Sequence, residues 1–281
     1  QGQAAAISIH NIPNAEKPSE GTALERITPF TENNLLAALI PLPPKDVRAD
    51  DWTLVSVTRQ GMVKKSPLSE LPGPSAGTFT IVRVNEGDQL GWLGLSQGGS
   101  EIFMVTRNGM SIRFSEEEVR PMGLVAAGVI GIKLQKGDEV AGFELLPKGK
   151  ISRAFFIASD GTAKRVPLSQ FPTQGRYGQG VMAWKLPRKV TVVGMAVEGD
   201  TTRITLHLKI LAAKSARIDE APPLTRTARG QKVLELKEKD EVIHLTVPWE
   251  PKRPLKPAGK RKASEPDGAS ASPAKSKRTR R

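Results

Sequence analysis

The sequence predicts an all-β, propeller-like fold built from repeats of about 50 residues and followed by a disordered, basic C-terminal tail. Glycines that follow a polar loop and precede an alternating apolar run recur at spacings of 56, 51, 52 and 50 residues. Short stretches rich in Val, Ile, Leu, Phe and Thr lie between turn residues, and no window of about 11 residues keeps a helical period. The recurring glycines are Gly21, Gly77, Gly128, Gly180 and Gly230.

Two further markers repeat in step with these glycines. A hairpin pattern of strand, turn, glycine and basic strand occurs at residues 58–65, 106–113 and 158–165. A polar or acidic turn precedes a strand at residues 32–34, 86–88, 136–138 and 238–240. Three markers with one period indicate a repeated supersecondary unit. Because a lone four-stranded sheet cannot bury both faces, neighbouring units must stack like the blades of a propeller.

The repeats predict the elements and the domain boundaries. In the third complete repeat we expect strands at residues 154–158, 162–166, 181–186 and 190–197. The expected β-pinwheel, a propeller-like domain, covers residues 1–251, and residues 252–281 form the Lys/Arg/Pro-rich tail. Residues 2–7 match only the second half of the hairpin, so we expect this chain to be a fragment that lacks the preceding strand. The expected blades are 1–51 (partial), 52–101, 102–152, 153–202 and 203–251.

Composition argues against several classes of function. The chain has no Cys, which removes disulfides, thiolate metal sites and a cysteine nucleophile. Its three His are not at metal-ligand spacing and its acids are scattered, so we expect no metal site. No apolar run is long enough to span a membrane, no signal peptide is visible, and no Walker-type phosphate loop is present. The single Tyr, Tyr177, lies in a glycine-rich loop without a helical pattern, so we expect no catalytic residue.

The formal net charge of +13 is concentrated in two segments. Residues 251–281 contain 11 Lys/Arg and two acids, and residues 151–190 contain seven Lys/Arg and the single acid Asp160. Basic charge focused in this way indicates a polyanionic partner. The tail has almost no large apolar residues after Leu255, so it cannot bury enough surface to fold, and its basic clusters would bind phosphates non-specifically.

The third repeat carries two specific motifs, GTAKRVPLS at residues 161–169 and QGRYGQGV at residues 174–181. They resemble the C-terminal β-pinwheel of the A subunit of bacterial DNA gyrase and topoisomerase IV, the type IIA topoisomerases. That family's motif is a Gln, two further residues rich in Arg and Gly, then Gly-Gly, a base and Gly. This sequence departs from it at Tyr177, where a Gly is usual, and at Gln179, where a base is usual. Weaker matches at residues 64–70 and 225–230 extend the resemblance over about residues 1–250.

The resemblance implies a non-catalytic domain that binds and wraps double-stranded DNA through its phosphates, without sequence specificity, to support strand passage and supercoiling. It implies as partners the ATPase B subunit, together with the remainder of the A subunit, in an A2B2 holoenzyme, with no membrane partner. No cofactor is expected in this chain, although the resembled holoenzyme uses ATP and Mg²⁺. The implied location is the bacterial cytoplasm, in association with the nucleoid. The family's strand-cleaving Tyr belongs to a separate winged-helix region that precedes the pinwheel.

We expect the DNA contacts to centre on the glycine-rich loop at residues 174–180. Its glycines permit positive φ and leave backbone N–H groups uncovered, and Arg176 supplies a planar fork for phosphate. Lys64, Lys65 and Arg113 could instead be solvated charges on a strand face. The candidate DNA-binding residues are Gln174, Gly175, Arg176, Tyr177, Gly178, Gln179, Gly180, Lys164, Arg165, Lys185, Arg188, Lys189, Lys64, Lys65, Arg113, Arg226 and Arg229.

A second interpretation from a different class stays open at this point. The chain could be a free-standing β-propeller scaffold for protein interactions that its basic tail tethers to the nucleoid. The incomplete first hairpin favours the topoisomerase interpretation, because a free-standing propeller is expected to begin with a complete blade.

Overall fold

Alternating apolar stretches between tight turns fold as antiparallel strands in the computed structural model, which describes residues 2–33, 36–42, 52–147, 149, 152–199 and 203–247. Helical structure in these residues is limited to α1 (Leu24–Ile27) and to single 3₁₀ turns. No helix in the described part is long and apolar enough to cross a membrane. The 3₁₀ turns are Ile9–Asn11, Pro18–Glu20, Leu68–Glu70, Pro74–Ala76, Glu116–Glu118, Leu168–Gln170 and Ile218–Glu220.

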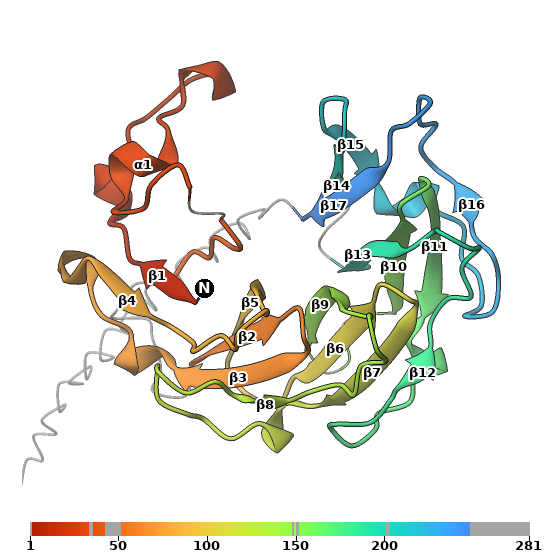
Figure 1. The fold of residues 1–281 in the computed structure, drawn as a ribbon, viewed down its shortest axis with the longest axis horizontal. Helices are drawn as coiled ribbons and strands as arrows, with labels where there is room; N and C mark the ends of the chain where they lie inside the picture. The colour runs from red at the N-terminus through yellow and green to blue at the C-terminus, as the bar shows by residue number, and fades with distance from the viewer. Residues whose placement is uncertain are drawn as a thin grey trace, which may run out of the picture. The chain divides into compact units, whose positions relative to one another are not determined.

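Four sheets follow one another along the chain (Figure 1), and all their neighbouring strands are antiparallel. The first has the order β5-β2-β3-β8, with β2 Thr53–Thr58, β3 Met62–Pro67, β5 Leu90–Ser96 and β8 Val129–Ile130. The second has the order β9-β6-β7-β12, with β6 Glu101–Thr106, β7 Met110–Ser115, β9 Val140–Leu146 and β12 Val181–Met182.

The third and fourth sheets repeat this plan. The third has the order β13-β10-β11-β16, with β10 Arg153–Ala158, β11 Thr162–Pro167, β13 Val192–Val197 and β16 Gln231–Lys232. The fourth has three strands in the described residues, in the order β15-β14-β17, with β14 Arg203–Leu208, β15 Lys214–Arg217 and β17 Val242–Thr246. Near the N-terminus, β1 (Gln3–Ala5) pairs with β4 (Thr78–Thr80). Because β5, β9, β13 and β17 contact one another in this order, the predicted all-β, propeller-like class is confirmed; the predicted tail lies outside the described residues.

The outermost strand of each four-stranded sheet comes from the following repeat, as the outer positions of β8, β12 and β16 in Figure 1 show. Val181 pairs with Ser111 and Met182 with Met110, so β12 belongs to the second sheet. The strand expected at residues 181–186 is therefore shorter than predicted and joins a different sheet from the one expected. Alternation reports which residues are buried and not which strand lies beside them. We call β4, β8, β12 and β16 the crossing strands.

A glycine precedes β8, β12 and β16 because the chain passes very close to the neighbouring backbone there. Gly128, Gly180 and Gly230 have φ values of 91°, 77° and 89°, which L residues rarely adopt. A Cβ on Gly180 would lie only 2.1 Å from the carbonyl oxygen of Ser111. The glycine that marks the period in the sequence is thus the point at which each repeat joins the preceding sheet.

Apolar side chains fill the spaces between consecutive sheets. Between the second and third sheets, the ring centroid of Phe103 lies 5.0 Å from that of Phe171 and 6.3 Å from that of Phe156. Trp184, only 1% exposed, joins this cluster, and its Nε1 donates to the carbonyl of Arg229 at 2.9 Å. Each repeat therefore depends on its neighbours for a covered core as well as for a strand.

Replacing Gly180 with Ala tests whether the close approach of the backbones before β12 requires a glycine. We expect a loss of unfolding free energy of about 2 kcal/mol or more, because the left-handed backbone alone costs an L residue about 1–2 kcal/mol and Ser111 must also move. Gly175→Ala is the matched control in the same loop, since nothing lies within 4 Å of a Cβ there. Urea unfolding measures both variants, and equal midpoints would contradict the proposed role of Gly180.

Candidate nucleic-acid interface

The glycine-rich loop at residues 174–180 lies against the backbone of the second repeat. The N–H of Gln174 donates to the carbonyl of Arg113, and the N–H of Tyr177 donates to that of Gly131, both at 2.8 Å. The carbonyl of Gly178 accepts from the N–H of Lys133 at 2.9 Å. The fold therefore uses the backbone N–H groups of Gln174 and Tyr177, while none of these three bonds engages the N–H of a loop glycine.

Positive φ is also distributed differently from the prediction. In this loop Gly180 (77°) and Tyr177 (69°) have it, while Gly175 and Gly178 do not. Tyr177 is 51% exposed, and Gly175 and Gln179 are exposed as well. The loop thus presents a tyrosine ring at its tip rather than a bare glycine backbone.

Arg176 braces the loop against the preceding crossing strand. Its Nη1 donates to the carbonyl of Ile130 at 2.9 Å, and its backbone N–H donates to the Glu118 carboxylate at 2.8 Å. Arg226 repeats the arrangement one repeat later, with Nη1 donating to the carbonyl of Met182 at 2.8 Å and its N–H donating to Gln170 at 3.0 Å. Both guanidinium groups are already partly engaged, so neither is the free phosphate fork that the sequence predicts.

Lys64 and Lys164 were expected to contact DNA, and their burial corrects this prediction. The Nζ of Lys164 donates to the carbonyls of Thr225, Arg226 and Ala228 at 2.6–3.2 Å and lies 5.0 Å from the ring centroid of Trp184. The side chain is fully buried. These three carbonyls belong to the glycine loop at residues 224–230, so the lysine holds that loop from inside.

Lys64 has the same task one hundred residues earlier in the chain. It is 1% exposed, and its Nζ donates to the carbonyls of Ile81 and Leu124 at 2.8 and 2.5 Å. Burial lowers the pKa of Lys64 to about 8, although the negative charge of Glu70 acts to raise it. Burial likewise lowers the pKa of Lys164 to about 7, with the positive charge of Arg226 acting in the same direction.

Three further predicted contacts are occupied by acids or carbonyls of the chain. Arg165 forms an ion pair with Glu198 at 2.6 Å, and Lys65 lies 3.9 Å from the buried carboxylate of Glu116. Arg113 is ion-paired with Glu101 and also donates to the carbonyls of Leu168 and Phe171. Their charges are neutralised inside the protein, which corrects the expectation that they extend a positive surface track.

Four of the predicted cations remain exposed. In the described part of the chain, no ion pair or side-chain hydrogen bond engages them. These residues are Lys185, Arg188, Lys189 and Arg229.

Alignment of the crossing strands shows two cations that the sequence analysis missed. The third residue after the end of β4, of β8 and of β12 is a base in each case. These bases are Arg83, Lys133 and Lys185, which are all exposed and have no ion pair among the described residues. We call these three residues the cation row. The backbone N–H groups of Arg83 and Lys133 donate to the glycine loop of the following repeat, at Ala126 and Gly178. The sequence does contain a signal for these two cations. Each stands five residues before the last residue of a polar turn, Arg83 before the end of the turn at 86–88 and Lys133 before the end of the turn at 136–138.

The fourth position of the row has the opposite charge. Glu235 stands three residues after the end of β16 and is exposed. The row therefore runs along three consecutive crossing strands and stops at the fourth.

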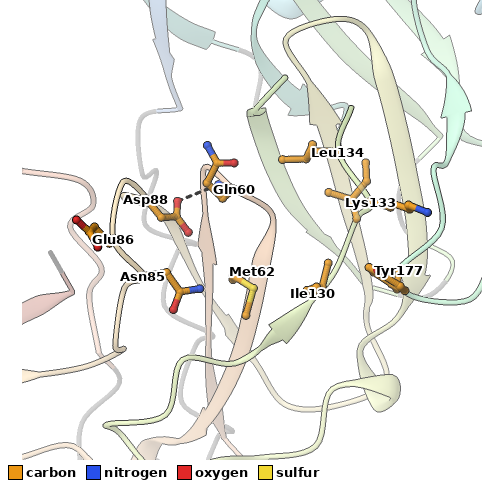
Figure 2. A pocket seen from close by; sticks show the side chains of 10 residues that line it. Gln60, Met62, Asn85, Glu86, Asp88, Ile130, Lys133, Leu134 and Tyr177 are labelled. Carbon is orange, nitrogen blue, oxygen red and sulfur yellow. Dashed lines mark hydrogen bonds between the residues drawn. The ribbon is translucent and has the colours of Figure 1, made fainter. Parts of the chain in front are cut away.

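Figure 2 shows a cavity of about 360 Å³ beside Lys133 and Tyr177. Its floor includes Met62 and Ile130, and its opposite wall carries Glu86 and Asp88. Because these carboxylates would repel phosphate, the candidate interface is the exposed row and not the cavity. No group of three or more His, Asp or Glu suitable for a metal ion occurs in the described ranges.

The arrangement defines a class of protein, an all-β repeat domain whose sheets exchange strands and which exposes a cation at the same position of three consecutive repeats. Residues 53–90, 100–147, 153–197 and 213–248 match the family model described as DNA gyrase C-terminal domain, beta-propeller. The chain belongs to this family, the C-terminal domain of the gyrase and topoisomerase IV A subunits, and the resemblance inferred from the sequence is confirmed.

Relatives and solved structures agree with this assignment. The chain is 31% identical to the DNA gyrase A subunit of Kosmotoga olearia over 253 residues and 29% identical to that of Deinococcus deserti over 249 residues. These alignments cover 88% and 86% of the chain but only 30% of each relative. A crystal structure of the C-terminal domain of DNA topoisomerase IV matches with a TM-score of 0.73 and 26% identity, covering 80% of this chain and 70% of that one.

The buried lysine predicts a pH dependence of stability. The folded pKa of Lys164 is about 7, whereas an unfolded lysine has a pKa of about 10.4. Between these values the unfolded chain binds the extra proton, so raising the pH favours the folded state by up to about 1.4 kcal/mol per pH unit. Urea unfolding from about pH 7 to about pH 9 should show the wild-type chain gaining stability relative to Lys164→Met. A difference that stays constant or shrinks with pH would contradict this assignment.

Proposed function

We propose that this chain binds and wraps duplex DNA through its backbone phosphates, along the cation row. The observation that carries the proposal is the recurrence of an exposed, unpaired base at one position of three consecutive repeats. Membership of the gyrase C-terminal family supports it. Repeated contacts at a fixed interval suit a polymer whose charge is itself regularly spaced.

Wrapping requires many distributed contacts rather than one strong contact. Smooth bending of a duplex site of 20–30 base pairs costs on the order of 1–6 kcal/mol, which contacts along a curved surface must offset. Each neutralised phosphate releases counterions and contributes to affinity. The successive repeats offer Arg83, Lys133 and Lys185 for this purpose, with Arg229 on the last glycine loop as a further exposed base.

The binding is expected to be independent of base sequence. Readout of bases in the major groove needs a helix or a two-stranded ribbon that fits the groove. The only α-helix in the described residues is the four-residue α1, which is too short for this role. The exposed cations instead suit phosphate oxygens, which carry no sequence information.

The DNA-binding set differs from the one that the sequence predicts. Lys64, Lys65, Lys164, Arg165 and Arg113 are assigned structural roles, because acids or carbonyls of the protein occupy their donors. The exposed residues of the central glycine loop are proposed to lie beside the DNA and to shape the path that it follows. They are Gly175, Tyr177 and Gln179.

In the whole protein, we propose that this domain supports strand passage without catalysing it. It would act with an ATPase B subunit, together with the remainder of an A subunit, in an A2B2 holoenzyme, which would use ATP and Mg²⁺ outside this chain. The corresponding location is the nucleoid in the bacterial cytoplasm. The names of the relatives support this proposal, since both are A subunits of DNA gyrase.

A topological assay tests the function directly. The chain is bound to nicked circular plasmid at low salt, ligase seals the nick, and the linking-number distribution is resolved on a gel. We expect a shift that grows with protein concentration and that largely disappears in the triple variant Arg83→Ala, Lys133→Ala, Lys185→Ala. Wild-type protein that binds without any shift would contradict wrapping, and absence of binding would contradict the whole proposal.

A second triple variant controls for net charge. Lys17, Lys209 and Arg217 are exposed but ion-paired with Glu20, Glu241 and Asp219. Replacing these three with Ala removes the same formal charge and leaves the cation row intact. We expect this control to keep most of the linking-number shift.

Reversing the charge at the end of the row should extend it. Because Glu235 occupies the fourth position, Glu235→Lys is expected to increase duplex affinity and the linking-number shift. Glu220→Lys makes the same charge change at an exposed position outside the row. An equal gain in both variants, measured by duplex binding and by the ligation assay, would show that only net charge matters.

A further inference from the structure

The turns that follow the crossing strands are built alike in four repeats. Three of them end in an aspartate whose carboxylate joins the turn to the adjacent hairpin. The Oδ1 of Asp138 accepts from the N–H groups of Asn108 and Glu139 at 3.0 and 2.9 Å, and Asp88 and Asp240 make the same pair of bonds. Each turn is closed by a hydrogen bond between its fourth and first residues: Asp88 to Asn85, Asp138 to Gln135, Val190 to Pro187 and Asp240 to Lys237.

In the third repeat the turn is joined to the adjacent hairpin without a carboxylate. Val190 stands in the place of the aspartate, and the hydroxyl of Ser159 accepts from the N–H of Thr191 at 3.2 Å. The N–H of Ser159 donates in return to the carbonyl of Thr191 at 2.8 Å. Asp160, on the neighbouring hairpin, accepts from the N–H of Thr162. A hydroxyl thus performs the structural task, and the turn itself carries no negative charge.

Loss of this acid leaves a segment of uniform positive charge. Residues 185–190 contain three exposed bases and no acid, which gives a formal charge of +3. The corresponding segments 83–88, 133–138 and 235–240 mix both signs and carry −1, +1 and −1. In the described structure no ion pair engages the three bases of the third repeat, which are Lys185, Arg188 and Lys189.

The backbone of Lys189 provides a second, independent observation. Its φ is 69°, in the left-handed region, at a position that Gly87 and Gly137 hold in other repeats with φ of 74° and 78°. A glycine would adopt this conformation without strain. Backbone conformations of this kind cluster at functional sites, so the retention of a lysine here points to a function for its side chain. Lys239, with φ of 68°, holds the same position in the fourth repeat but lies between Glu238 and Asp240.

We propose that the turn at residues 187–190, together with Lys185, is the site at which the protein holds a DNA phosphate most strongly. This proposal rests on the proposed function and deepens it, because it identifies the third repeat as the one that binds the duplex most strongly. Arg188 offers a planar fork to two phosphate oxygens, and Lys189 adds a compact charge. Because no ion pair within the turn has to break first, both donors are available to the DNA backbone.

Two matched substitutions test the site. Lys189→Gly and Lys239→Gly each remove one exposed lysine and relieve the same left-handed strain, but only Lys189 lies in the acid-free turn. Binding to a fluorescent duplex is measured over a range of salt concentrations. We expect Lys189→Gly to weaken binding and to reduce the slope of log affinity against log salt by about 0.9, as for one lost phosphate contact, while Lys239→Gly leaves the slope unchanged.

A third variant restores the acid without removing any cation. Val190→Asp installs the residue that the other three turns contain, so the fold has precedent for it. We expect weaker duplex binding and a smaller salt slope. Val190→Asn is the uncharged control of nearly the same shape and should bind duplex almost as the wild type does. Thermal unfolding of all four variants verifies that each is folded.

The outcomes separate this inference from the function on which it rests. Wild-type protein that fails to bind duplex overturns the proposed function. Wild-type binding combined with equal slopes for Lys189→Gly and Lys239→Gly overturns the site and leaves the function standing. Variants that lose affinity for a polyglutamate peptide but keep their affinity for duplex would also overturn it, because the turn would then recognise acidic protein segments rather than DNA.

Discussion

The pairing of each crossing strand with the preceding sheet is the constraint on which the rest of the structure depends. In β8, β12 and β16 only two residues, such as Val181 and Met182, make this pairing, and the glycine before them lets the backbones approach. The pairing fixes the glycine loop upstream of it and the cation three residues downstream. One short strand therefore sets the position of both the loop and the exposed charge in every repeat, which is why the cation row keeps its register although the side chains vary.

The basic residues divide into two groups with different physical tasks. Lys64 and Lys164 replace water as donors to the carbonyls of tightly turned loops, and burial lowers their pKa as a consequence. Arg176 and Arg226 tie those loops to the crossing strands. The cations that stay exposed and unpaired in the described structure are not needed by the fold, and a polyanion can use this surplus. Counting charges along the sequence could not separate the two groups.

The fold was largely predictable because glycines that the backbone requires recur along the sequence with the period of the repeat. Glycines such as Gly180 are needed wherever a Cβ would meet a neighbouring backbone, so their spacing reports the repeat. Strand exchange was not predictable, because alternating burial at residues 181–186 is the same whichever sheet accepts the strand. The site was predicted only in part: Lys185 and Arg188 are exposed as expected, whereas Lys164 reads as a surface base although its partners are carbonyls about 60 residues away.

Strand exchange also bears on how the chain is made. Since each outer strand is encoded in the next repeat, no four-stranded sheet can reach its full width until about 35 residues beyond its third strand have left the ribosome. Until then the hairpin edge, for example that of β7, offers unpaired N–H and carbonyl groups to any extended segment nearby. Nascent neighbours on one messenger RNA expose the same edge at the same time. Synthesis that pauses between repeats would thus lengthen the time in which strands of different chains can pair.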